Sequence, residues 1–328
     1  MPTQPLPRDR MLMFGQVRLG DDPSPVLTEL THSAGTGARV GEPVAVTRTF
    51  VCDPPFFGGA DIGRLTVCGA VNSLAAQGAE PRQVTLGLTV EAGLPGTRLR
   101  QLAASVRRTA AEAGVAVTGV HARVVRAGDA DQLYVTATAV GAARHRPPDP
   151  ADTAPGDRVV VSGPLGDHEA HLLSLRAGLG YEHHVSSRCA PLADLIDAAH
   201  SAAGGSVRAV REPAEGGLAA VLDAVAAAGC TSVEIEEASL PVRRVTRLAL
   251  DELGLAPWAA ASPGTLCVVV APEAVPPLLA ALRAHPRGRR AAVVGTVRRE
   301  TEHRLLLRTP DGTARPLPTT ATPAARVL

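Results

Sequence analysis

Residues 54–95 read PPFFGGADIGRLTVCGAVNSLAAQGAEPRQVTLGLTVEAGLP, and this stretch decides the fold class. Apolar side chains recur at helical spacing over 61–77, and Gly78 is a helix-ending residue. Residues 83–91 then alternate apolar and polar side chains, which is typical of a half-buried strand. The same patterns predict a helix over 95–113 and strands over 26–30, 43–51, 115–119 and 132–141. We therefore expect an α/β (α+β) domain in this half of the chain.

A chain of 328 residues and 33.7 kDa is long enough for about two domains. The segment HRPPDPADTAPGD at 145–157 is rich in proline and charge, as linkers are. It predicts a first domain over 1–150 and a second over 151–328. In the second domain, the patterns predict strands over 158–162, 232–235, 265–270 and 292–297, and helices over 168–178, 191–203, 217–228 and 272–285. From residue 310 the chain is rich in Pro and Thr, and we expect a loose tail there.

Composition excludes several classes of protein. The net charge is +1 and the basic residues are dispersed, which argues against a nucleic-acid surface. No apolar run approaches the length of a membrane-spanning helix, and the first residues show no secretory pattern. The five cysteines are scattered and form no zinc-type motif. The sequence therefore predicts a cytoplasmic protein. It contains no Lys and one Asn, which is Asn72.

The first candidate site is the glycine turn that leads into the helix over 61–77. Gly59 lets the backbone approach a ligand, and Asp61 either caps the helix N-terminus or binds a cation. Asn72 lies 11 residues beyond Asp61, about three turns, so both fall on roughly one helix face. Asn72 is either a ligand-binding amide or a structural one.

Two more glycine turns precede helices in the second domain. In GPLGDHEAH at 163–171, Asp167 and His168 are candidates for acid–base chemistry. His168 and His171 lie three residues apart on one predicted helix, so a pair of metal ligands is the less favoured alternative. In REPAEGGL at 211–218, Gly216 and Gly217 can cradle phosphate or can simply cap a helix. Glu212 and Glu215 beside them would repel phosphate unless a divalent cation bridges.

A third carboxylate feature lies near the N-terminus. Asp21 and Asp22 follow Gly20, and paired loop carboxylates suit magnesium. The chain holds no GxSxG, HExxH, Walker A or GxGxxG motif. From these residues alone we expect a two-domain protein with several glycine turns at helix starts, able to bind an anion.

Together these phrases resemble HypE, the hydrogenase maturation family of the PurM (aminoimidazole ribonucleotide synthetase-like) superfamily. The resemblance runs from about residue 43 to about residue 312 and is most specific over 54–95. It is supported, in the same order, by the stretches at 159–179, 188–192, 212–222 and 282–297.

The resemblance implies a two-domain PurM-like fold and a homodimer built through the N-terminal sheets. It implies ATP with Mg²⁺ in the cleft between the domains. Family members dehydrate a thiocarboxamide on their own C-terminal cysteine to a thiocyanate, and their partners are HypF and the HypC–HypD scaffold. The residues carried over for nucleotide binding are Gly59, Asp61, Asn72, Gly216, Gly217 and Arg48, and those for metal are Asp22 and Asp61.

Several positions depart from the family pattern. The family's terminal cysteine has no counterpart in Ala325–Leu328, a metal-binding Asp falls on Arg48, and another acidic position falls on Val120. The family's Asn-Asp pair is Asn72-Ser73 here, and Glu215 replaces an Arg of the phosphate turn. A like-charge contact at ~4 Å and an effective dielectric of about 20 costs on the order of 4 kcal/mol. These departures predict weakened or lost Mg-ATP binding, with Arg48 as a phosphate ligand that needs no metal.

Three hypotheses follow. The favoured one is a divergent HypE-like paralogue that acts non-catalytically or modulates a Cys-terminated HypE through the shared dimer surface. The alternative is a repurposed nucleotide- or anion-binding enzyme that acts on a free small molecule, since one fold hosts several chemistries. The third is a working carbamoyl dehydratase whose thiol another protein supplies.

Overall fold

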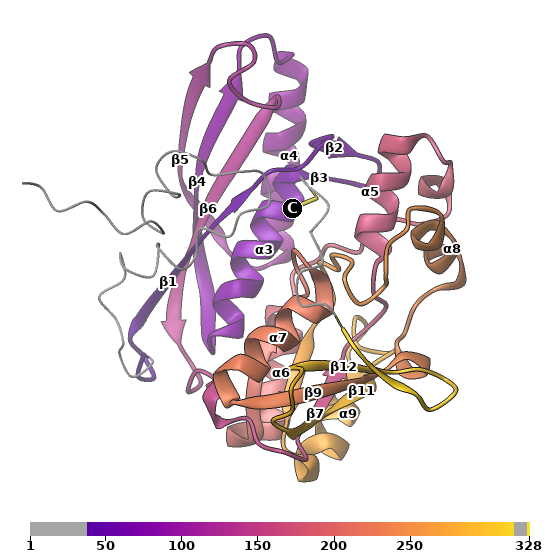
Figure 1. The fold of residues 1–328 in the computed structure, drawn as a ribbon. Coiled ribbons are helices and arrows are strands. Elements are labelled where there is room, and N and C mark those ends of the chain that lie inside the picture. Colours follow the sequence, from indigo (N-terminus) through magenta and orange to yellow (C-terminus); the bar gives the residue numbers. More distant parts are fainter. Residues whose placement is uncertain (1–37, 318–326) are drawn as a thin grey trace, which may run out of the picture.

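The computed structural model describes residues 38–317 and 327–328, and Figure 1 shows their arrangement. The elements of the N-terminal unit are β1 (Pro43–Phe50), β2 (Phe56–Phe57), β3 (Ala60–Asp61), α3 (Ile62–Ala76), β4 (Ala79–Glu91), α4 (Gly96–Glu112), β5 (Ala116–Val125) and β6 (Leu133–Ala143). Among the described residues, β1, β6, β4 and β5 form one sheet in that order, with β4 and β5 parallel and the other pairs antiparallel.

Helices α3 and α4 cover one face of this sheet (Figure 1). Helix α3 is buried along almost its whole length, including Leu65, Val71 and Leu74, because it packs between the sheet and the second unit. Strand β6 alternates strictly between buried and half-buried residues, as a strand with one covered face does. The predicted N-terminal helices and strands are confirmed, and the expected strand over 26–30 lies outside the described residues.

The C-terminal unit contains strands β7 (Arg158–Val161), β8 (Val207–Arg211), β9 (Thr231–Glu236), β10 (Cys267–Val270), β11 (Ala292–Arg299), β12 (Leu305–Arg308) and β13 (Ala314–Pro316). Within the described ranges they form one sheet in the order β13-β12-β9-β11-β7-β10-β8. Its helices are α5 (Asp167–Ala177), α6 (Ala193–Ala203), α7 (Gly217–Gly229), α8 (Arg244–Glu252) and α9 (Val275–Ala284). The molecule is thus a mixed α/β protein, as predicted.

Several predicted boundaries were wrong. The strand expected over 115–119 runs to Val125, because β5 pairs with β4 along its whole length. The sequence patterns missed α8 and the short strands β2, β3, β12 and β13; β12 is held by β9 on one side and β13 on the other. The tail expected to be loose from residue 310 therefore contains a strand.

The last two residues return to the N-terminal unit. Val327 forms a β-bridge with Cys52, and the Val51 N–H donates to the Leu328 carbonyl at 2.7 Å. Figure 1 shows this end of the chain beside α3. No helix among the described residues is long and apolar enough to cross a membrane.

Candidate functional site

A cavity of about 270 Å³ lies where α3 and β1 meet the second unit. Its lining includes Arg48 and Phe50 from β1, Asn72 from α3, and Arg211 and Glu212 from the end of β8. The remaining lining residues are Val46, Thr47, Leu65, Gly69, Ser73, Ala76, Gln77, Ala214, Pro263 and Leu328. The linker separates the two units in sequence, so only the fold brings these residues to one place. We refer to this cavity as the cleft.

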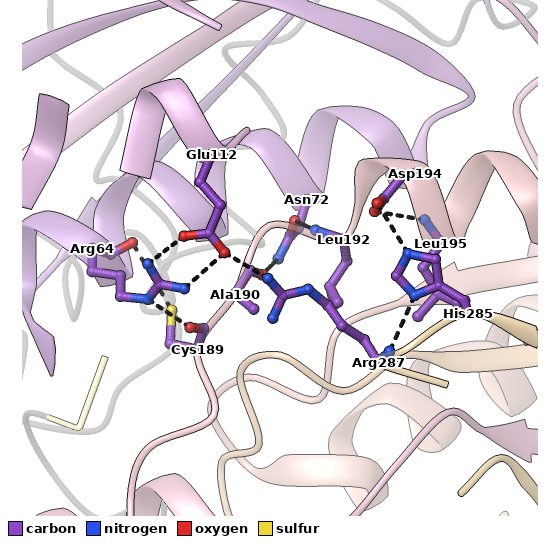
Figure 2. A network of polar contacts seen from close by, with 10 residues as sticks. All are labelled: Arg64, Asn72, Glu112, Cys189, Ala190, Leu192, Asp194, Leu195, His285 and Arg287. Atoms are coloured by element: carbon purple, nitrogen blue, oxygen red, sulfur yellow. Dashed lines mark hydrogen bonds and ion pairs between the residues drawn. The ribbon is translucent and has the colours of Figure 1, made fainter. Parts of the chain in front are cut away.

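Asn72 is the polar centre of the cleft wall. Its Nδ2 donates to the Ala190 carbonyl at 3.0 Å and to the Glu212 carboxylate at 3.2 and 3.3 Å, and its Oδ1 accepts from the Leu192 N–H at 2.7 Å. Figure 2 shows the amide of Asn72 beside Ala190 and Leu192. Because the side chain is buried and both ends of the amide are engaged, its present role is to join the two units.

Glu212 supplies the acidic group of the cleft. Its carboxylate accepts from Asn72 and from the backbone N–H of Gly264. Removal from water raises the pKa of Glu212 to about 7, although the hydrogen bonds from Gly264 and Asn72 and the charge of Arg48 act in the opposite direction. The Glu212 carboxyl group is therefore a weaker acid than an ordinary glutamate.

Two arginines line the same cleft as this carboxyl group. Arg48 and Arg211 both line the cleft, and the charge of Arg48 contributes to lowering the pKa of Arg211, after the larger effect of burial. The Arg211 guanidinium donates to the Val210 carbonyl at 2.9 Å. A cleft lined by two guanidinium groups and one weakly acidic carboxyl group suits a bound anion better than a bound cation.

Asp61 lies away from the cleft lining. It is the N-cap of α3: its Oδ1 accepts from the Arg64 N–H at 3.0 Å and from the Ser105 hydroxyl at 2.6 Å. Gly59, in the turn between β2 and β3, does not line the cleft either. Of the two alternatives for Asp61, the geometry supports the helix cap.

The donor set was tested against magnesium, which takes oxygen ligands from carboxylates and from substrate phosphates. Asp22 lies outside the described residues. Asp61 is buried and its Oδ1 already accepts two hydrogen bonds, and Glu212 is held by Asn72 and Gly264. No group of three or more His, Cys, Asp or Glu side chains in the described ranges could hold a metal ion. The described residues therefore do not fit a magnesium site.

Asp167 and His168 occupy the first turn of α5. The His168 ring bonds Ser187 Oγ at 2.8 Å and the Val327 carbonyl at 2.6 Å, and burial lowers its pKa to about 4. Asp167 accepts from Thr246 at 2.5 Å and pairs with Arg243 at 3.3 Å. His171 turns to the Val185 carbonyl. These groups lie outside the cleft lining and hold protein segments together.

Gly216 and Gly217 begin α7 with positive φ angles of 72° and 62°. A Cβ on Gly217 would lie 2.5 Å from the Ala259 carbonyl carbon, so glycine is required for close packing of this turn. Neither glycine lines the cleft. Glu215 is exposed and absent from the lining, whereas Glu212, the other acidic residue of this segment, lines the cleft.

The family comparisons identify the two units of the fold. Residues 35–143 match the AIR synthase related protein N-terminal domain, and residues 154–308 match the corresponding C-terminal domain. The carbamoyl dehydratase HypE of Azotobacter vinelandii is 39% identical over 279 residues, which are 84% of this chain and 81% of that protein. The chain belongs to the HypE family. It is a HypE-like protein of the PurM superfamily with the two-domain architecture that the resemblance implied.

Solved HypE structures superpose on most of the chain. A crystal structure of HypE in complex with ATP has a TM-score of 0.83 at 30% identity and covers 98% of this chain and 96% of that one. HypE in a HypE–HypF complex has a TM-score of 0.80 at 30% identity and covers 84% and 90%. Arg48 and Asn72, which the sequence predicts to bind nucleotide, both line the cleft, and their role in binding stays a prediction. Sequence reasoning missed Arg211 as a cleft residue and read Glu212 only as a phosphate-repelling neighbour.

Proposed function

We propose that this chain is a divergent HypE-family protein that does not carry out Mg-ATP-dependent carbamoyl dehydration and acts instead through protein contacts. One observation carries the proposal. The cleft is lined by Arg48 and Arg211, and its acidic group, Glu212, is already held by Asn72 and Gly264. A site that meets the charge of Mg-ATP needs carboxylates free to hold the metal.

The partners proposed are the proteins with which HypE-family members assemble. The relative in the HypE–HypF complex covers 84% of this chain, which supports a HypF-type partner. The HypC–HypD scaffold and a Cys-terminated HypE are the other partners that the family resemblance implies.

A homodimer through the N-terminal sheet is part of the same proposal. Helices α3 and α4 cover one face of this sheet, and on strand β5 Val120 and Val124 are 60% and 67% exposed. Residues two apart on a strand share a face, so Val120, Ala122 and Val124 form one exposed small apolar row. Exposed apolar surface of this kind marks a contact face.

The cytoplasmic location stays a prediction of the sequence.

A second candidate is favoured by the two cleft arginines. A repurposed enzyme that binds ATP or another anion without metal would use Arg48 and Arg211 as direct phosphate ligands. Both candidates share the loss of magnesium dependence, and they differ in whether the cleft binds nucleotide at all.

Calorimetric titration with ATP, with and without Mg²⁺, tests the proposal. If the chain acts only through protein contacts, we expect no binding up to millimolar ATP under either condition. If it is an anion-binding enzyme, we expect it to bind ATP equally well with and without the metal. Micromolar binding that requires Mg²⁺ would contradict both. In parallel, incubation with HypF, carbamoyl phosphate and ATP should leave the intact mass of the chain unchanged.

A further inference from the structure

A second cavity, of about 210 Å³, lies outside the cleft and shares no lining residue with it. We call this cavity the arginine pocket. It is bordered by Pro164 and Pro286 and lined by five arginines, which are Arg188, Arg243, Arg287, Arg289 and Arg290. Five like charges around so small a space are repulsive unless acidic groups or a bound anion offset them.

The arginines come from three separate segments of the second unit. Arg188 precedes α6, Arg243 is the residue before α8, and the other three lie on the turn between α9 and β11. The basic character of the pocket is therefore assembled by the fold and is not a run of charge on one exposed element.

The turn that carries three of the arginines is tightly held. The Gly288 N–H donates to the His285 carbonyl at 3.0 Å, and the Ala291 N–H donates to the Gly288 carbonyl at 2.8 Å. The Arg283 guanidinium donates to the Ala291 carbonyl. A Cβ on Gly288 would lie 2.1 Å from the Leu282 carbonyl oxygen, so a glycine is needed for the turn to pack this closely. The arginines are thus presented by a backbone that is already ordered.

Two of the five charges have acidic partners. Arg243 pairs with Asp167 at 3.3 Å, and Arg287 pairs with Glu112 at 2.5 Å. Figure 2 shows Arg287 directed to Glu112, which also binds Arg64. These pairs position two guanidinium groups and reduce the net positive charge of the pocket.

The other three have no partner side chain among the described residues. Arg289 and Arg290 are exposed and make no side-chain hydrogen bond or ion pair there. Arg188 is half-buried, and its Nε is buried without an acceptor. Burial, followed by the charge of Arg243, lowers the pKa of Arg188, and the charges of Arg290 and Arg287 act in the same direction, whereas the charge of Asp167 acts against them. A buried donor without an acceptor costs free energy that a bound anion would recover.

We propose that the arginine pocket binds an oxyanion of the phosphate class, of the size of inorganic diphosphate. Guanidinium groups match phosphate oxygens through paired N–H donors, and tetrahedral groups accept from several directions at once. A single carboxylate is planar and carries one charge, so it would leave part of the pocket unpaired. A phosphate group carries up to about two charges near neutral pH. The site is separate from the cleft and does not depend on the proposed function.

Calorimetric titration with inorganic diphosphate at constant ionic strength tests the proposal. The full chain should bind one equivalent with a dissociation constant in the micromolar range. Arg188→Gln and Arg290→Gln should each weaken binding by about tenfold, equivalent to about 1.4 kcal/mol. Arg290 is exposed, so its variant tests the site even if Arg188→Gln impairs folding. Arg123→Gln, on β5 outside the pocket, is the matched control.

An Arg48→Gln variant separates the two cavities. Unchanged diphosphate binding in Arg48→Gln supports the arginine pocket, whereas loss of binding would place the anion in the cleft and overturn the proposal. The proposal is also overturned if no heat is detected up to millimolar diphosphate, or if Arg123→Gln weakens binding as much as Arg290→Gln. Equal affinity for an acidic peptide would overturn the assignment to phosphate.

Discussion

Asn72 Nδ2 lies 3.2 and 3.3 Å from the two carboxylate oxygens of Glu212, so one amide joins helix α3 to the segment that follows β8. The same amide binds the backbone of Ala190 and Leu192. The three connections link the N-terminal unit to two separate segments of the C-terminal unit at the wall of the cleft.

Replacing Asn72 with alanine should destabilise the protein. The change removes the partner of the Leu192 N–H and of the Glu212 carboxyl group in a buried place, and lost buried hydrogen bonds cost about 1–3 kcal/mol each. We expect a free energy of unfolding lower by about 2 kcal/mol or more, measured by urea unfolding. Ser73→Ala, on the next residue of the cleft wall, should change it by less than about 0.5 kcal/mol. Equal effects of the two substitutions would show that the amide does not join the units.

Glu212 should make the protein less stable as the pH rises. Its pKa in the folded state is raised to about 7 from the ordinary 4.5, so between these values the folded state binds more protons than the unfolded state. The contribution of Glu212 to the free energy of unfolding therefore falls as the pH rises from about 4.5 and levels off above about 7. Glu212→Gln should remove this slope. The stability of the variant relative to the parent protein should therefore be higher at pH 8 than at pH 5.

His168 acts in the opposite direction, so the measurement must be a difference. Burial lowers the pKa of His168 to about 4 from 6.5, and its contribution to stability is lost as the pH falls through that range. Subtracting the unfolding free energies of Glu212→Gln from those of the parent at each pH from 5 to 8 cancels the histidine. A flat difference curve would contradict the raised pKa of Glu212.

Asp61 should behave as a helix cap and not as a metal ligand. Asp61→Ala removes the acceptor for Arg64 N–H and for the Ser105 hydroxyl, and a lost N-cap costs about 0.5–2 kcal/mol. Asp61→Asn retains a capping oxygen and should lose less. Thermal unfolding with and without Mg²⁺ checks this: the midpoint should not shift with the metal in either protein. If Mg²⁺ raises the unfolding midpoint of the parent but not that of Asp61→Ala, Asp61 is a metal ligand and this prediction is wrong.

The apolar row on β5 should hold the proposed homodimer together. Val120→Glu places a charge at one end of this row and should convert a dimer into a monomer, measured by light scattering after size exclusion. Leu248→Glu on α8 is the control, because Leu248 is also exposed, at 49%, but lies on the other unit. A monomeric parent, or a dimer that survives Val120→Glu, would rule out this surface.

Much of the fold was readable because the signals are local. The helix over 61–77 and the strand over 83–91 follow from periodicity within one segment, and α3 and β4 occupy almost those residues. The missed strand β12 depends on pairing with β9, which lies about seventy residues earlier in the chain. A short strand held by a distant partner leaves only a weak local pattern.

The candidate site was readable only in part. Arg48 and Asn72 were identified from the family pattern and both line the cleft. The sequence around Gly217 and His168 also indicated a binding or catalytic site. In the structure, Gly217 packs against Ala259, and His168 binds Ser187 and Val327. Local sequence cannot distinguish these roles, because a glycine turn before a helix looks the same whether protein or ligand lies above it.

The sequence by itself determined the family and the order of most elements, since these are properties of residue identity and spacing. Only the tertiary structure decided that Glu212 faces Asn72 with a raised pKa, and that Arg188, Arg243 and Arg290 share one pocket. Burial and charge proximity arise between residues far apart in the chain, and both depend on how the two units and their loops pack.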